Sequence, residues 1–502
     1  MKNLMTVGCA LCAVSAFALM EPATPESQGV SSEGILKFID AAEKTFDAGE
    51  AGALHGFVIV RHGKVIAEGS WKPFDTLNET HMLYSHSKSF TSSAIGFLAD
   101  EGKVDLDERI VDIFPEDVPE KPDPRLGELR VRDLLTMNVG ADRDHTIGRN
   151  PSGWTKWFMK KELQRRPGTG FKYDSDATYM LAAIVEKKSG EKMMDYLKRK
   201  MFDKIGITKA WTTYSPEGIP CGGWGMNMTT REMARFGQLY LNRGKWGDEY
   251  VLSPFWVDLA TCRHTWSGWQ NVGVKALGEG TDWEQGYGFQ FWRCTHGAYR
   301  ADGAAGQYTV VMPEQDAVIS IHASLNNLQL VLTHIWDYLL PEMKPAALPE
   351  DAAAQDALKR RLAKLEIAPV KSATSLGADF MKKFELKENK RGFKSVAFEH
   401  VEVEGKTRVR CRIVTRMGEQ SFLAGYGEWV RGGKIRIEPE TYERLGGYIG
   451  EFDVSASCGN GPVFHLRAYM TGATSYLDFT VDGTGKLKGV FGAMGGVDLE
   501  SK

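Results

Sequence analysis

The sequence lacks an excess of charge of either sign. Its 502 residues carry a formal net charge of −3, and acidic and basic side chains are mixed along the chain. No basic stretch provides the electrostatic footprint that nucleic-acid binding requires. The expected partner is therefore a small molecule and not a nucleic acid.

Cysteine is scarce and irregularly spaced. Two of the seven cysteines fall in the apolar N-terminal stretch, and the other five are far apart, without a Cys-x-x-Cys pair: Cys221, Cys262, Cys294, Cys411 and Cys458. We expect these five to be small buried residues. One disulfide is possible in an oxidising compartment, but the sequence does not indicate which cysteines would pair. The sequence also lacks His-Glu-x-x-His and any convincing metal-ligand cluster, so we expect no metal and no cofactor.

One long apolar stretch stands at the N terminus. Met1-Lys2 followed by Leu4–Met20 is typical of an export signal, and Ala16-Phe17-Ala18 fits its cleavage rule, which assigns residues 1–18 to the signal. A membrane anchor is the alternative, but the run contains polar residues and has no stop-transfer flank. Cys9 comes too early for a lipoprotein cysteine. We expect an exported bacterial protein, periplasmic or extracellular, without a stable membrane span after cleavage.

The length of the chain predicts more than one domain. Residues 19–345 have strand patterns at both ends and helical patterns between them, which indicates an α+β unit with a helical insertion. Residues 346–372 form a proline-spaced linker with an amphipathic connector helix, and residues 373–502 show regular short strands with glycine turns. We therefore expect an α+β domain followed by a small all-β barrel or sandwich.

The segment around Ser85 is the strongest candidate for chemistry. A hairpin pattern at residues 57–67 precedes it, and Phe90, Ala94, Phe97 and Leu98 follow at helical spacing. Ser85 is therefore expected in the first turn of a helix, with Lys88 three residues later on the same face.

A buried lysine beside a serine can act on that serine's proton. Burial lowers the pKa of the amine and favours its neutral form, which could take the proton of Ser85. The alternative for Ser85 is an ordinary helix N-cap. A second match to this spacing, Ser189 to Lys192, follows a lysine pair and a helix-ending glycine signal and lacks the preceding strand.

Further elements follow from periodicity and caps. Residues 33–48, 131–135, 181–185 and 328–340 are expected to be helical, and Thr229–Glu232 is a capping box. Strands are expected at these ranges: 287–292, 308–312, 317–321, 407–414, 422–424, 435–437, 463–466, 476–481 and 487–491.

Three motifs together give a family resemblance over about residues 25–345. Ser85-x-x-Lys88, Tyr173-Asp174-Ser175 and the glycine-rich segment at Gly303 resemble the serine β-lactamase and penicillin-binding-protein hydrolases. The similarity is greatest to the class C β-lactamase, family VIII esterase and 6-aminohexanoate-dimer hydrolase branch. The resemblance implies an antiparallel sheet flanked by helices. The C-terminal region resembles the lipocalin-like barrels appended to such enzymes.

The resemblance also implies catalytic roles. Ser85 would be the acylated nucleophile, Lys88 its proton partner, and Tyr173 the general base that later protonates the leaving group. Backbone N–H groups of Ser85 and Ala304 would form the oxyanion hole.

Two departures from the family pattern concern substrate binding. Ser175 stands where asparagine is usual, and Ala301-Asp302-Gly303 replaces a motif that begins with a cation. Arg300 could supply that cation, but neighbouring residues of a strand point to opposite faces. With Asp302 and Gly303 beside the substrate, the sequence favours neutral or amine-bearing substrates over carboxylates.

Six tryptophans fall where this family lines its pocket: Trp154, Trp157, Trp224, Trp266, Trp269 and Trp283. An aromatic pocket would suit apolar groups, although core packing explains any one of them equally well.

The function expected from the sequence is an exported serine hydrolase that cleaves a small ester or amide through an acyl-enzyme. A β-lactamase or D,D-carboxypeptidase is one alternative, and a non-catalytic ligand-binding protein on the same fold is another. Because every candidate catalytic residue precedes residue 345, a protein truncated near that residue is expected to keep measurable activity if it stays soluble. A soluble, folded truncation that binds substrate without turning it over would show that the barrel contributes to the site.

Overall fold

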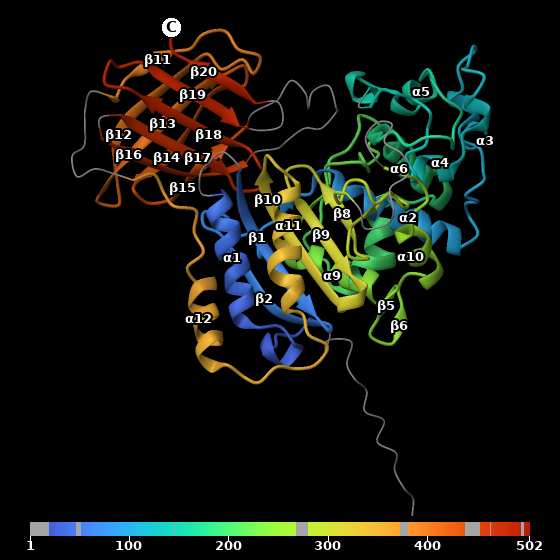
Figure 1. Cartoon of the computed structure of the whole chain (residues 1–502). Helices are drawn as coiled ribbons and strands as arrows, with labels where there is room; N and C mark the ends of the chain where they lie inside the picture. Colours follow the sequence, from blue (N-terminus) through green and yellow to red (C-terminus); the bar gives the residue numbers. More distant parts are fainter. Residues whose placement is uncertain are drawn as a thin grey trace, which may run out of the picture.

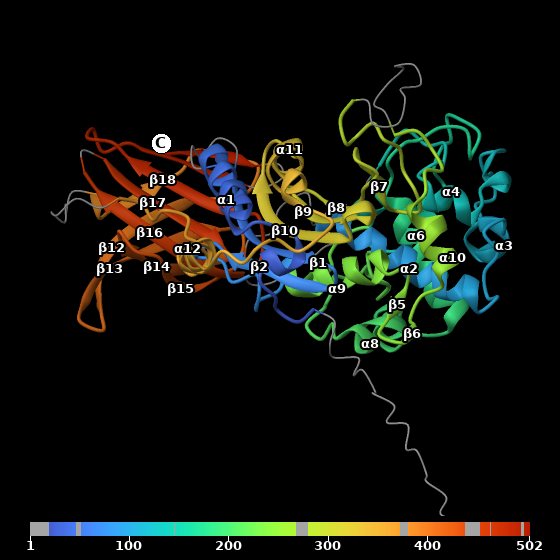
Figure 2. The same ribbon diagram turned by 60° about the horizontal axis from the view of Figure 1, so that its bottom comes forward.

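A computed structural model describes residues 20–46, 52–144, 146–267, 280–371, 380–436, 452–461, 463–492 and 496–502. They form an N-terminal α+β domain and a C-terminal β domain (Figure 1). The expected export signal and Trp269 lie outside the described residues. Both views place the C-terminal domain at one end of the molecule and the helical insertion at the other, with the N-terminal sheet between them (Figure 2).

The N-terminal domain is built on one six-stranded sheet with the strand order β2-β1-β10-β9-β8-β7. All neighbouring strands are antiparallel, and the sheet joins segments from both ends of the domain, as expected. Its strands are β1 (Gly52–Arg61), β2 (Lys64–Ser70), β7 (Trp292–Arg293), β8 (Tyr299–Gly303), β9 (Gln307–Met312) and β10 (Ala317–Leu325).

Helices cover both faces of this sheet (Figures 1 and 2). The sequence between β2 and β7 supplies the insertion, which is largely helical. The helices of the domain are α1 (Ser32–Phe46), α2 (Ser87–Asp100), α3 (Ile110–Ile113), α4 (Val131–Leu135), α5 (Trp154–Met159), α6 (Ser175–Ser189), α7 (Met193–Leu197), α8 (Asp203–Ile205), α9 (Thr230–Leu241), α10 (Pro254–Thr261) and α11 (Gln329–His334).

Alternation along β1 explains the two layers of core. Phe57 and Ile59 pack in one cluster with residues of α1 and α11, while Val58 and Val60 pack in the other with residues of α2, α6 and α9. Successive side chains of a strand point to opposite faces, so one strand serves both cores. The capping box at Thr229 is present, because Thr229 and Glu232 each bond the other's backbone N–H at the start of α9.

The strand expected at residues 287–292 was largely wrong. Only Trp292–Arg293 forms β7, whereas Tyr287 makes single bridges to Thr265 and Trp292. Gly286 has φ 98°, and a Cβ on Gly288 would lie 2.2 Å from the carbonyl oxygen of Ala260, so this segment is a loop pressed against the end of α10. A short apolar run does not by itself distinguish a strand from a buried loop.

The C-terminal domain is one curled sheet. Its strands follow the order β11-β12-β13-β14-β16-β17-β18-β19-β20, with β15 paired to β16. Backbone bonds from Lys387 to Glu500 and from Lys502 to Glu385 join its first and last strands. The strands are β11 (Lys383–Glu385), β12 (Ser395–Val403), β13 (Lys406–Thr415), β14 (Gly418–Tyr426), β15 (Val430–Ile435), β16 (Phe452–Asn460), β17 (Phe464–Met470), β18 (Tyr476–Val481), β19 (Leu487–Gly492) and β20 (Val497–Glu500).

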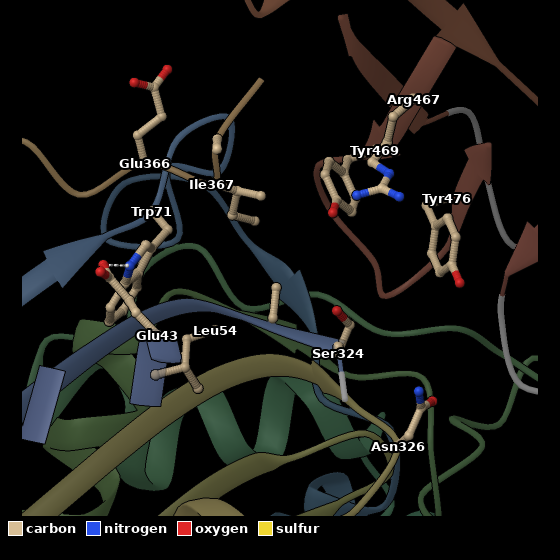
Figure 3. Close-up of a pocket in the computed structure, with 13 residues that line it drawn as sticks. Glu43, Leu54, Trp71, Ser324, Asn326, Glu366, Ile367, Arg467, Tyr469 and Tyr476 are labelled. Carbon is tan, nitrogen blue, oxygen red and sulfur yellow. Dashed lines mark hydrogen bonds between the residues drawn. The ribbon is translucent and has the colours of Figure 1, made fainter. Parts of the chain in front are cut away.

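The connector helix α12 (Ala352–Leu362) packs on the N-terminal domain. Leu358 and Leu365 belong to the same core cluster as α1 and α11. Near this connector, a cavity of about 130 Å³ lies between the two domains (Figure 3). Trp71 and Ser324 of the N-terminal domain line one side, and Arg467, Tyr469 and Tyr476 of the C-terminal domain line the other. None of the candidate catalytic residues lines this cavity.

The described cysteines form no disulfide. Cys221, Cys294, Cys411 and Cys458 are buried, as expected, but Cys262 is exposed. Within the described ranges, no helix combines the length and the apolar character needed to cross a membrane.

Candidate active site

Ser85 lies in a tight turn between a short strand and a buried helix. The chain runs from β3 (His81–Met82) through the 3₁₀ turn η3 (Tyr84–His86) directly into α2. Tyr84 has φ 50°, a left-handed conformation that is unfavourable for a residue with a Cβ. Ser85 therefore precedes the first turn of α2 instead of lying within it, and it follows a strained residue.

The amine of Lys88 makes three hydrogen bonds. Its Nζ donates to Ser85 Oγ at 3.1 Å, to Ser175 Oγ at 3.0 Å and to the carbonyl oxygen of Gly223 at 2.6 Å. The side chain is 1% exposed. Burial lowers the pKa of Lys88 to about 8, although nearby carboxylates led by Asp144 oppose the shift. A neutral amine is thus accessible beside Ser85 near physiological pH.

Tyr173 completes the contacts of Ser85. Its hydroxyl is hydrogen-bonded to the Ser85 side chain, and Lys88 Nζ lies 4.8 Å from its ring centroid. Its ring stacks on Trp292 at 5.8 Å. Burial raises the pKa of Tyr173 and the bond from Ser85 only partly opposes this, so the phenol is protonated at rest.

Ser175 lies behind Lys88. It is fully buried, and its backbone N–H donates to Asp144 Oδ1 at 2.6 Å. Ser175 is not among the described residues that line the cavity at Ser85. The structure therefore places it where it holds Lys88.

Three carboxylates near Lys88 come close enough to share a ligand: Asp144, which also lines the cavity at Ser85, Asp174 and Asp176. The Lys161 ammonium pairs with two of them, at 2.7 Å from Asp174 and 2.8 Å from Asp176. Lys161 thus compensates part of the negative charge of the cluster, and these contacts form a buried ion-pair network.

Strand β8 carries the third motif against the nucleophile turn. A Cβ on Gly303 would lie 2.0 Å from the carbonyl oxygen of Leu83, so only glycine allows this approach. Ala304 follows at the end of the strand, packs against Tyr84 and Met82, and lines the same cavity as Ser85. Both residues expected to supply oxyanion N–H groups therefore border one space.

Asp302 is paired within its own strand. Arg300 and Asp302 are two residues apart, so both point to the same face, and Arg300 Nε lies 2.7 Å from Asp302 Oδ2. Arg300 is completely buried and also donates to the carbonyl oxygen of Asp282. Burial raises the pKa of Asp302 to about 6 against the opposing effect of Arg300. The carboxylate borders the cavity, but Arg300 compensates its charge.

A cavity of about 440 Å³ opens at Ser85. Its aromatic wall consists of Phe171, Tyr173, Trp283 and Trp292. Of the six tryptophans considered from the sequence, Trp283 borders this cavity.

The other described tryptophans of that set lie elsewhere. Trp154 and Trp224 belong to the core, while Trp157 and Trp266 are 44% and 38% exposed. For these four, a place in the pocket lining is wrong. Trp292, which the sequence placed only in a strand, borders the cavity instead.

Sequence reasoning missed the groups that hold Lys88 from behind. Gly223 accepts its shortest hydrogen bond, and a Cβ on Gly223 would lie 2.8 Å from the carbonyl oxygen of Ser175. The adjacent glycines at 222 and 223 were the available signal for such a close backbone approach. Asp144 had no comparable signal, because it reaches Ser175 from a loop distant in sequence.

An antiparallel sheet with helices on both faces, and a half-buried serine bonded to a buried lysine beside strand β8, define the class of protein. The Beta-lactamase family model matches residues 39–337, and the chain belongs to this family of β-lactamase-fold hydrolases.

The chain is also similar to individual known proteins. The chain is 26% identical over 334 residues to the 6-aminohexanoate-dimer hydrolase of Paenarthrobacter ureafaciens, a match covering 61% of this chain and 80% of the relative. A penicillin-binding protein homologue from Caulobacter crescentus is 15% identical with a TM-score of 0.49, over 62% of this chain and 99% of its own. The octameric penicillin-binding protein homologue from Pyrococcus abyssi is 16% identical with a TM-score of 0.49, over 93% of this chain and 100% of its own.

Proposed function

We propose that the protein is a serine hydrolase that cleaves a small ester or amide through an acyl-enzyme on Ser85. The observation that carries this proposal is the buried Lys88 amine, 3.1 Å from Ser85 Oγ, with a pKa lowered to about 8. A surface lysine would remain charged and could not accept the serine proton.

The two pKa shifts separate the roles of Lys88 and Tyr173. Neutral Lys88 takes the Ser85 proton as Oγ attacks the carbonyl carbon of the substrate. Tyr173, protonated at rest and bonded to Ser85, then donates its proton to the leaving group and is reprotonated from Lys88. Water then attacks the acyl-enzyme, and the same proton transfers run in the reverse direction. This step releases the carboxylic acid product and restores Ser85. The backbone N–H groups of Ser85 and Ala304 stabilise the oxyanion, each with an effect of about 10²–10³ on rate.

The walls of the cavity favour substrates with an apolar or aromatic part. Trp283, Trp292 and Phe171 offer aromatic surface, and the Arg300–Asp302 pair adds no net charge. Arg300 does not replace the missing cation of the third motif, because it is bonded to Asp302 and to the carbonyl oxygen of Asp282. The described charged residues that border the cavity are three acidic ones, Asp142, Asp144 and Asp302, and one basic one, Lys172, so the balance opposes a carboxylate-bearing substrate. Neutral esters and amides are therefore the proposed substrates, ahead of carboxylate-bearing β-lactams and D-alanyl peptides.

The test is covalent labelling with a fluorophosphonate, followed by intact-protein mass and peptide mapping. We expect one adduct, on Ser85, that is lost in Ser85→Ala. Ser189→Ala is the matched control, because Ser189 has the same spacing to a lysine but is the last residue of α6. An adduct that persists in Ser85→Ala would reject the assignment, and an unreactive protein would favour the non-catalytic alternative.

Substrate class is tested with two chromogenic compounds. We expect turnover of p-nitrophenyl butyrate to exceed turnover of nitrocefin in kcat/KM. The opposite order would favour a β-lactamase or D,D-carboxypeptidase.

Export is a separate proposal, supported by the sequence of residues 1–18 alone. The test is cell fractionation together with N-terminal sequencing of the mature protein, which we expect to begin after Ala18.

A further inference from the structure

The residue before the candidate nucleophile is bonded to the other domain. The Tyr84 hydroxyl and Thr474 Oγ1 are 2.6 Å apart, although these residues are 390 positions apart in the sequence. Tyr84 is 7% exposed and Thr474 is 6% exposed, so this hydrogen bond is shielded from water. Thr474 lies between β17 and β18, at the end of the C-terminal domain that meets the N-terminal sheet.

The same loop bonds the segment leading to Ser85 at other points. The backbone N–H of Met82 donates to the carbonyl oxygen of Gly472 at 3.0 Å, and His81 is hydrogen-bonded to the backbone of Ala473. We call residues 471–475 the docking loop. It is attached to β3 and to η3, the two elements that lead the chain into Ser85.

Apolar contacts join these elements to the oxyanion side of the site. Met82 and Tyr84 form a buried cluster with Ala304 of the N-terminal domain and Phe452 of the C-terminal domain. Ala304 and Ser85 carry the two N–H groups proposed for the oxyanion hole. Tyr84 therefore contacts one oxyanion residue, precedes the other and is held by Thr474.

The conformation of Tyr84 explains why such support matters. A non-glycine residue at φ 50° adopts that conformation only where surrounding contacts enforce it. His62, also at φ 50°, belongs to an exposed hairpin turn and is followed by a glycine, whereas Tyr84 is buried and has no glycine beside it. Relaxation of Tyr84 would rotate the following peptide and shift Ser85 relative to Lys88 and Ala304.

We infer that the docking loop of the C-terminal domain is part of the active site, with Thr474 as a positioning residue that holds the nucleophile turn through Tyr84. This inference rests on the proposed function of Ser85. It adds a contribution from the C-terminal domain to the candidate catalytic residues expected from the sequence, all of which precede residue 345. Thr474 acts on acylation and not on substrate affinity, because it does not border the cavity at Ser85.

The test uses full-length protein and the variant Thr474→Val, which removes the hydroxyl but keeps the shape of the side chain. We expect the rate of Ser85 labelling and kcat to fall by about 10- to 100-fold with KM changed less than threefold, since small misplacements of reacting groups cost about that much. Thr474→Ser keeps the hydroxyl and should restore most of the rate. Thr480→Val is the matched control, because the Thr480 hydroxyl donates to the carbonyl oxygen of Lys488 on the next strand of the same domain.

A second variant isolates the hydrogen bond itself. Tyr84→Phe should lose activity by a similar factor, and Tyr84→Phe combined with Thr474→Val should lose little more, because both remove one interaction. Labelling of Thr474→Val within twofold of wild type, or fully additive losses, would overturn the inference while leaving the proposed function standing. If wild-type protein shows no label on Ser85, the proposed function fails and this inference fails with it.

Discussion

At the scale of single residues, the site depends on buried charges whose partners differ. Lys88 is buried against hydroxyl and carbonyl oxygens, which do not hold its proton, whereas Arg300 is buried against the carboxylate of Asp302. Burial without a directly paired anion lowers the pKa of an amine, and a paired anion keeps a cation charged. Lys88 can therefore lose its proton near neutral pH, whereas Arg300 stays charged.

The pKa of Lys88 predicts the pH dependence of the reaction. Because that pKa is lowered to about 8, only about a tenth of the amine is neutral at pH 7, and the neutral fraction grows as the pH rises. We expect kcat/KM for a neutral ester to increase about tenfold from pH 7 to pH 9, which a pH–rate profile measures. A flat profile over this range would contradict Lys88 as the base.

The Arg300–Asp302 pair predicts an asymmetric mutational effect. Asp302→Asn leaves a fully buried guanidinium without its anion, and breaking such a pair costs about 3–5 kcal/mol in the free energy of unfolding. Arg300→Met combined with Asp302→Asn removes both charges and should recover most of that loss.

Urea denaturation of the three proteins measures the effect. If Asp302→Asn is as stable as wild type, the pair is not what holds this strand, and Asp302 would be free to select substrates by charge.

At the scale of elements, the site lies where three segments of the backbone approach one another closely. Strand β8, the turn η3 and the glycines before residue 224 approach so closely that Gly303 and Gly223 each leave no room for a Cβ. Such approaches place N–H groups and carbonyl oxygens within reach of the reacting atoms without using a side chain.

Gly303→Ala tests this packing. Its Cβ would meet the carbonyl oxygen of Leu83 at 2.0 Å, so β8 must move away from the nucleophile turn. We expect a loss of about 1–3 kcal/mol in stability and at least a 100-fold fall in kcat.

Gly127→Ala is the control, because nothing lies within 4 Å of its Cβ position in the turn Leu126–Glu128. That variant should stay within about 0.5 kcal/mol of wild type in a thermal melt. Equal effects of the two substitutions would show that close approach at residue 303 is unimportant.

At the scale of the whole molecule, the two domains meet over a buried polar layer. His55, His81 and His322 are fully buried beneath the nucleophile segment, and His81 also contacts the docking loop. An ion pair between Glu79 and Arg431 joins the domains at the rim, with 2.7 Å between Glu79 Oε1 and Arg431 Nη1. The junction thus combines these polar contacts with the apolar cluster of Met82, Tyr84 and Phe452, and it lies close to Ser85.

These histidines predict acid sensitivity. Burial lowers the pKa of His81 to about 4 and holds those of His55 and His322 well below the ordinary value of 6.5. Below pH 6.5 these histidines bind protons in the unfolded chain but remain neutral in the folded protein. The free energy of unfolding therefore falls as the pH drops from 6.5 towards 4. For His81 alone the loss approaches roughly 3 kcal/mol.

The measurement is the melting temperature at pH 7 and at pH 5. His81→Asn should show a smaller drop between these pH values than wild type, while the exposed His400→Asn should show the same drop as wild type. If His81→Asn loses as much melting temperature between pH 7 and pH 5 as wild type does, groups other than His81 control the loss of stability in acid.

Local patterns in the sequence determined much of the framework. The spacing of Ser85 and Lys88, the capping box at Thr229, the hairpins around residues 62 and 314 and the alternation along residues 406–415 all depend on neighbours a few positions apart. Helical and strand periodicity and cap chemistry are properties of that short range, so they can be seen without the fold.

Only the tertiary structure decided what surrounds those elements. Gly223 and Asp144 behind the Lys88 site, the pairing of Arg300 with Asp302, the burial of Trp154 away from the cavity and the bond between Tyr84 and Thr474 join segments far apart in the chain. The free energy of such contacts depends on burial and on which partner arrives, and neither is encoded at a fixed spacing in the sequence. The motif therefore identified the candidate nucleophile, while the environment that lowers the pKa of Lys88 and the contacts from the second domain emerged only when the chain was folded.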